Sequence, residues 1–159
     1  MTTSNGTGPR VVVGVDGSTE SIEALRWAAA YAAAMGATID AVMSWHLPTA
    51  AGVIPPGIAS QTITEEARAS MLEVLDKALV AVFGPATPPT VQARVTYGHP
   101  AVVLVDESQN ADLLVVGNRG HGAFAGMQTG SVSMHCVNNA HCPVVVVKGP
   151  DATMERDTR

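Results

Sequence analysis

The sequence predicts an α/β domain: a doubly wound, five-stranded parallel sheet in the order 3-2-1-4-5, with helices on both faces. Short apolar segments rich in β-branched residues alternate along the chain with longer segments of helical periodicity. The apolar segments show little polar alternation, which is typical of strands covered on both faces. Because a helix separates each strand from the next, we expect right-handed crossovers and parallel strands.

The first strand is predicted over residues 11–15, where the chain reads Val-Val-Val-Gly-Val. Ser18 is a suitable N-cap for the helix that follows, and Glu20 places a negative charge in its first turn. Apolar residues then recur at helical spacing as far as Met35. Gly36 can adopt the left-handed conformation that ends many helices, so we expect this helix to stop there.

The second strand is predicted over residues 38–43 and is followed by a loop rich in proline and glycine. Thr62 and Glu65 have the spacing of a capping box, which predicts that the second helix begins at Thr62. An amphipathic stripe continues until Gly84 and Pro85, which end the helix.

The second half of the chain repeats this alternation. Pro100 suits the first position of a third helix, and Ser131 is expected to cap a fourth helix that runs to about residue 140. The three remaining strands are predicted over residues 91–96, residues 112–116 and Val144–Val147.

The composition fits one domain with an aliphatic core. The chain has 159 residues, of which 47% are hydrophobic but only 4% aromatic. We assign the domain to residues 10–149 and expect flexible polar tails over residues 1–9 and 150–159. The net charge is −5 and the sequence contains no basic block, which argues against general nucleic-acid binding.

Apolar segments and cysteines indicate the compartment. The longest unbroken apolar run, residues 27–35, is too short to cross a bilayer, so no membrane interaction is expected. The polar start of the chain lacks the apolar region of a signal peptide. The two cysteines, Cys136 and Cys142, make no disulfide framework. We therefore expect a cytoplasmic protein.

Two loops lie where such a sheet binds ligands, at the carboxyl ends of the strands beside the switch in strand order. The first, residues 14–18, follows the first strand, and the second, residues 117–131, follows the fourth. In the second loop, glycines allow positive φ and close approach of the backbone to a ligand. Its end starts a helix, where free N–H groups favour an anion, and Arg119 adds positive charge.

The same glycines can also be explained by a long turn alone, and from the loop alone the two interpretations are about evenly matched. Its length favours a ligand, because long loops without secondary structure are usually functional or disordered.

The spacing of this loop, Gly-2x-Gly-9x-Gly-Ser after the fourth strand, resembles the ATP-binding motif of universal stress proteins. Three other segments are similar to that family: Val-Gly-Val-Asp-Gly-Ser near the start, Gly-x-Pro-Ala before the third helix, and His-Cys-Pro followed by four valines. The resemblance covers essentially residues 10–149. It implies an ATP-binding protein of the stress response, with Mg²⁺ as a companion ion.

The resemblance also implies roles for individual residues. Asp16 would lie near the ribose and phosphates, where its carboxylate is the candidate metal ligand, and the backbone of Val42 would meet the adenine. The middle of the loop departs from a strong phosphate site because residues 124–128 bring no positive charge. The implied nucleotide-binding set is Gly14, Val15, Asp16, Val42, Gly117, Asn118, Arg119, Gly120, His121, Gly122, Gly130, Ser131 and Val132.

Other motifs fit less well. The chain has no Gly-x4-Gly-Lys-Ser/Thr motif of a P-loop. A Gly-x-Gly-x-x-Ala match at residues 120–125 lies outside the first βα unit, where a dinucleotide fingerprint belongs. Two His-Cys pairs, at residues 135–136 and 141–142, suggest zinc. They lie on a helix and in a loop before a proline, which gives them no natural convergence.

Three functions therefore stay open. The first is an ATP-binding regulator that acts as a nucleotide-dependent switch on an unidentified protein partner, without being an enzyme. The second is a slow ATPase or adenylyl-transfer enzyme, and the third is a family member that binds cyclic AMP or no nucleotide. A homodimer through Val144–Val147 is expected, because an apolar strand at a sheet edge leaves backbone groups unpaired.

Overall fold

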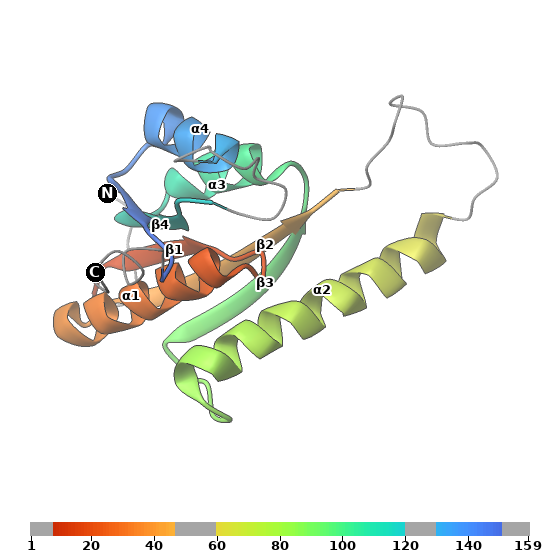
Figure 1. Ribbon diagram of the computed structural model, residues 1–159, viewed down its shortest axis with the longest axis horizontal. Helices are drawn as coiled ribbons and strands as arrows, with labels where there is room; N and C mark the ends of the chain where they lie inside the picture. The colour runs from red at the N-terminus through yellow and green to blue at the C-terminus, as the bar shows by residue number, and fades with distance from the viewer. Residues whose placement is uncertain (1–7, 47–59, 120–129, 151–159) are drawn as a thin grey trace, which may run out of the picture.

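A computed structural model describes residues 8–46, 60–119 and 130–150, and it confirms the predicted doubly wound sheet (Figure 1). Five parallel strands lie in the order β3-β2-β1-β4-β5. The elements along the chain are β1 (Arg10–Gly14), α1 (Thr19–Met35), β2 (Thr38–Trp45), α2 (Ser60–Phe83), β3 (Val91–Tyr97), α3 (Pro100–Ser108), β4 (Leu113–Gly117), α4 (Ser131–Asn139) and β5 (Val144–Val147).

The two faces of the sheet carry separate apolar layers. Successive strand residues point to opposite faces, so Val11 and Val13 of β1 pack under α1 and α2 with Leu25 and Leu75. Val12 lies on the other face, under α3 and α4. β4 is buried along its whole length, in agreement with the lack of polar alternation in its sequence.

Several helix ends agree with the sequence. Ser18 caps α1 by accepting a hydrogen bond from the Ser21 N–H at 3.2 Å. Gly36 ends the helix in the left-handed conformation, with φ of 65°. Pro100 occupies the first turn of α3, as predicted.

Other predicted boundaries were wrong. α2 begins at Ser60, two residues before Thr62, so the capping-box spacing does not mark its start. The N-cap of α4 is Gly130 rather than Ser131, which is already helical. β1 begins one residue early, at Arg10, because Arg10 pairs with Thr38 of β2. β2 continues past residue 43 to Trp45, since β3 extends to Tyr97 opposite it.

α2 is the longest of the described helices, and its N-terminal end projects away from the sheet (Figure 1). Among the residues of α2 whose side chains the structure describes, the buried ones, Leu75, Ala78 and Leu79, all lie in its C-terminal half. Within the three described segments, no helix combines the length and apolar character needed to cross a membrane.

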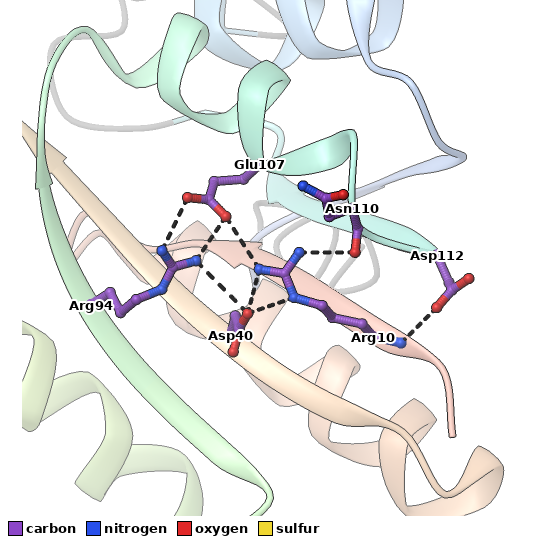
Figure 2. Close-up of polar contacts among 6 residues, drawn as sticks. All are labelled: Arg10, Asp40, Arg94, Glu107, Asn110 and Asp112. Atoms are coloured by element: carbon purple, nitrogen blue, oxygen red, sulfur yellow. Dashed lines mark hydrogen bonds and ion pairs between the residues drawn. The ribbon is translucent and has the colours of Figure 1, made fainter. Parts of the chain in front are cut away.

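Four charged side chains join α3 to three strands (Figure 2). Arg10 contacts the carboxylate of Asp40 at 2.5 Å and that of Glu107 at 3.2 Å. Arg94 reaches both oxygens of Glu107, at 3.1 and 2.7 Å. The pKa of Glu107 is lowered mainly by these hydrogen bonds from Arg94. The cluster therefore holds the C-terminal end of α3 against β1, β2 and β3.

This cluster should make part of the stability dependent on pH. Because the pKa of Glu107 is lowered in the folded protein, its contribution is present above the pKa of the unfolded chain and is lost as pH falls through the folded value. Glu107→Gln should destabilise the protein by about 1 kcal/mol at neutral pH, and the difference from wild type should be smaller at pH 3, below the pKa of about 4.3 of a free glutamate.

Urea unfolding at both pH values measures this difference. Glu73→Gln is the matched control, since Glu73 forms an exposed pair with Lys77 at 3.9 Å and should contribute little. A deficit of Glu107→Gln that persists unchanged at pH 3 would contradict the prediction.

Candidate functional site

The candidate site lies at the carboxyl ends of β1 and β4. These strands are neighbours in the sheet, with Val13 opposite Val115, although five elements separate them along the chain. The strand order reverses between them, because β2 lies on one side of β1 and β4 on the other. Ligands of doubly wound sheets bind in the crevice outside such a pair of strand ends.

The turn after β1 is held by a serine network. Asp16 accepts hydrogen bonds through Oδ1 from the N–H of Ser18, at 2.9 Å, and from its hydroxyl. The hydroxyl of Ser21 donates to the carbonyl of Ser18 at 3.0 Å and lies 3.3 Å from the Asp16 nitrogen. These bonds fix the half-buried carboxylate of Asp16 beside the first turn of α1. Ser21 belongs to no motif that pointed to this role.

Gly117, at the end of β4, is explained first by packing. A Cβ atom at this position would lie 2.8 Å from both the carbonyl carbon and the Cβ of Glu20 in the first turn of α1. Neither Gly117 nor Gly130 has a positive φ. The expectation that loop glycines serve left-handed backbone is therefore wrong at these two positions, and close approach of α1 accounts for Gly117.

Gly117→Ala should destabilise the protein without ligand by about 1–3 kcal/mol, the usual cost of overpacking. The clash is with backbone, which cannot move without displacing α1. Gly149→Ala is the control, because its added Cβ would meet the side chain of Glu20, 2.9 Å away at Cγ, and that side chain can rotate. Urea unfolding compares the two variants, and equal stability of Gly117→Ala and wild type would contradict the packing account.

α4 starts directly beside the end of β4. The N–H of Gly130 donates to the Asn118 carbonyl at 2.5 Å. The Asn118 N–H in turn donates to the carbonyl of Val147, at 2.8 Å. The hydroxyl of Ser133 donates to the carbonyl of Gly117 at 2.5 Å. Backbone bonds and the buried Ser133, which no sequence motif singles out, therefore set the position of α4.

The N-terminus of α4 can receive an anion. Its N-cap, Gly130, provides no side-chain cap. The first N–H groups of a helix have no partner within that helix, so those of Ser131, Val132 and Ser133 point out of its end. Together with the helix dipole, they form an environment that favours negative charge.

Arg119 brings positive charge to the same edge. The residue is half-buried, and its Nε atom is buried and makes no hydrogen bond within the described part of the chain. A buried polar nitrogen without a partner is costly. An anion or a ligand oxygen beside Arg119 would remove that cost, so the donor set at this edge fits a phosphate group.

The remaining predicted residues differ in their position relative to the strand ends. Gly14 ends β1, and Val15 follows it at the same edge of the sheet. Val42 lies within β2, with its side chain 1% exposed, and its carbonyl already accepts the Val15 N–H at 2.9 Å. Three predicted residues lie outside the described segments: Gly120, His121 and Gly122.

The cysteines and histidines do not form a metal centre in the segments that the structure describes, where no three His, Cys, Asp or Glu side chains gather suitably. Burial raises the pKa of the Cys136 thiol to about 11, as expected for a core cysteine. Cys142 is half-buried and its pKa is also raised by burial. Both thiols therefore stay protonated at neutral pH.

Comparisons with known proteins agree with this architecture. The sequence profile of the Universal stress protein family matches residues 9–148. A universal stress protein of Mycolicibacterium smegmatis is 35% identical over 151 residues, which cover 89% of this chain and 48% of that protein. The chain thus spans about half the length of this curated relative.

Two solved structures share the fold. A universal stress protein in complex with cAMP is 26% identical, with a TM-score of 0.65, over 89% of this chain and 97% of that one. A protein of the same family from Arabidopsis thaliana, with AMP bound, is 21% identical, with a TM-score of 0.60, over 94% and 97% of the two chains.

Proposed function

Because the chain belongs to the universal stress protein family, we propose that it binds an adenine nucleotide at the carboxyl ends of β1 and β4. The observation that carries the proposal is the uncapped N-terminus of α4, fixed beside Arg119 and the end of β4. In this arrangement the phosphates lie against Gly130, Ser131 and Val132. The solved structures that hold cAMP and AMP support a nucleotide of this class.

We propose ATP as the nucleotide, with Mg²⁺. The helix N-terminus and Arg119 supply several donors, which suits a chain of phosphates better than a single one. Asp16 is the carboxylate that would face the ion, since hard oxygen ligands suit Mg²⁺. Its Oδ1 already accepts two hydrogen bonds from Ser18 and is thereby oriented.

Cyclic AMP is the second candidate, because one solved neighbour holds it. The two ligands are distinguished by releasing the bound molecule from freshly purified protein and identifying it by mass spectrometry. The proposal expects ATP in a substantial fraction of the molecules. Cyclic AMP would move the assignment to the second candidate, and protein that neither retains nor takes up any adenine nucleotide would contradict both.

The nucleotide is proposed to act as a switch and not as a substrate that turns over rapidly. Fast phosphoryl transfer needs a positioned nucleophile, bridging metal ions and concentrated positive charge. Among the described residues, Arg119 is the cation and Asp16 the carboxylate that the proposed site uses, and no described group is positioned as a nucleophile. We expect bound ATP to release phosphate far more slowly than about 1 per second, the lower end of common enzyme rates.

A phosphate-release assay with purified protein, ATP and Mg²⁺ measures this rate. A rate above about 1 per second that Asp16→Ala abolishes would instead assign an ATPase. Persistence of intact bound ATP over minutes is the expected result.

The proposed switch includes a homodimer. β5 pairs with β4 on one side and forms the sheet edge on the other, and its four valines are all half-buried. The two helices that pack against β5 also expose apolar side chains: Met134 and Val137 of α4 are 46% and 50% exposed, and Trp27 of α1 is 38% exposed. A second copy related by a two-fold axis would cover this surface. The unidentified protein partner is proposed to read the nucleotide state of that dimer.

A further inference from the structure

Two histidines meet at the carboxyl edge of the sheet, on the side of β2 and β3. His46 follows β2, and His99 stands between β3 and α3. Their ring centroids are 5.4 Å apart and the rings are tilted by 36°. Both side chains are exposed to solvent. The N–H of Gly98 donates to the carbonyl of Trp45 at 2.8 Å, which fixes the two chain segments to each other.

The backbone conformation of Gly98 places His99 at the start of α3. The φ of Gly98 is 142°, in a region that side chains rarely allow, and an added Cβ would lie 2.9 Å from Cγ2 of Val103. His99 then occupies the N-cap position, where its Nδ1 accepts a hydrogen bond from the Ala101 N–H at 3.2 Å. A side chain at this position normally satisfies one of the free N–H groups of the helix.

This bond defines the protonation state of His99. Nδ1 can accept only if it carries a lone pair, so the ring is neutral with its proton on Nε2. The direction of this hydrogen bond also disfavours a metal ion between the two rings. A histidine that binds a metal through Nε2 needs a proton on Nδ1 and an acceptor for it, whereas Nδ1 faces a donor here.

We propose that His99 is a proton-sensitive cap of α3, which is released when Nδ1 of the ring takes up a proton. Protonation of Nδ1 removes the acceptor and turns the ring into a donor that faces the Ala101 N–H. It also places a positive charge at the positive end of the helix dipole and beside His46. Acidification therefore loosens the start of α3, next to the edge at which the strands end.

Few groups near His99 and His46 could stabilise a protonated imidazole. Within the described ranges, no carboxylate forms an ion pair with either imidazole. From the end of β3, Tyr97 packs edge-on against Trp45 instead. The carboxylate of Asp16, after β1, is bonded to Ser18. On α4, which packs against α3, Cys136 is buried and His135 is exposed.

Nuclear magnetic resonance of the full chain without nucleotide tests this proposal, so that its outcome is independent of the proposed ligand. Nitrogen spectra of the imidazoles at pH 7.5 should show His99 with its proton on Nε2. Exchange of the Ala101 amide with water, corrected for its intrinsic pH dependence, should become about fivefold less protected at pH 5.5, the typical effect of losing an N-cap.

His99→Asn keeps a capping side chain that does not titrate, so protection of the Ala101 amide should be independent of pH in this variant. His135→Asn removes an exposed histidine elsewhere and should behave like wild type. A His99 ring with its proton on Nδ1 at pH 7.5 would overturn the proposal. So would an equal loss of Ala101 protection in wild type and His99→Asn.

Discussion

Gly130→Glu is expected to abolish ATP binding while the fold stays intact. Gly130 is the N-cap of α4, with φ of −70° and ψ of 160°, a conformation open to any residue. A glutamate there adds bulk and a negative charge where the phosphates are proposed to lie. Two charge-assisted hydrogen bonds lost at about 1.5 kcal/mol each would weaken binding by at least about 100-fold.

Calorimetric titration with ATP measures the affinity, and thermal unfolding verifies that the variant is folded. Gly130→Ala separates bulk from charge, and Val137→Glu adds the same charge to an exposed position farther along α4. Val137→Glu should bind ATP like wild type. A folded Gly130→Glu with wild-type affinity would place the nucleotide elsewhere.

Val145→Lys is expected to convert the proposed dimer to a monomer. The side chain of Val145 is half-buried on the edge strand β5, and it packs partly against the core under α1. A lysine can keep its stem on that core but would bring its ammonium group into the two-fold contact. Placing an unpaired charge there should raise the dissociation constant of the dimer by at least about 100-fold.

Sedimentation velocity over a range of concentrations follows this change. Val137→Lys tests the neighbouring α4 surface, which does not contribute to the core, and Val80→Lys on the exposed face of α2 is the control. Wild-type protein that sediments as a monomer at about 100 μM would contradict the dimer, since stable interfaces of this kind form well below that concentration.

Local sequence signals were sufficient for the sheet and for most helix ends. Apolar runs predicted β1, β4 and β5, because strands buried on both faces are apolar throughout. β3 was predicted from alternating polar and apolar residues instead. Ser18 and Pro100 marked helix starts through chemistry confined to one turn. The start of α2 was missed because capping-box spacing occurs inside helices as well as before them.

Contacts between distant residues could not be predicted in the same way. Gly117 was selected as a ligand residue, yet its close contact is with Glu20, which lies far earlier in the chain. The cluster of Arg10, Asp40, Arg94 and Glu107 depends on strand register, which the sequence pattern leaves open. The pairing of His46 with His99 likewise requires knowing that β2 and β3 end together.

The most direct test of the nucleotide site follows the backbone amides of α4 during titration with ATP and Mg²⁺. In nitrogen-labelled protein, the amide resonances of Ser131, Val132 and Ser133 should shift strongly as ATP binds, because their N–H groups have no partner within the helix. The amide of Val137, inside the same helix, should shift little. ATP binding that leaves the first three amides unmoved, or no binding at all, would contradict the account.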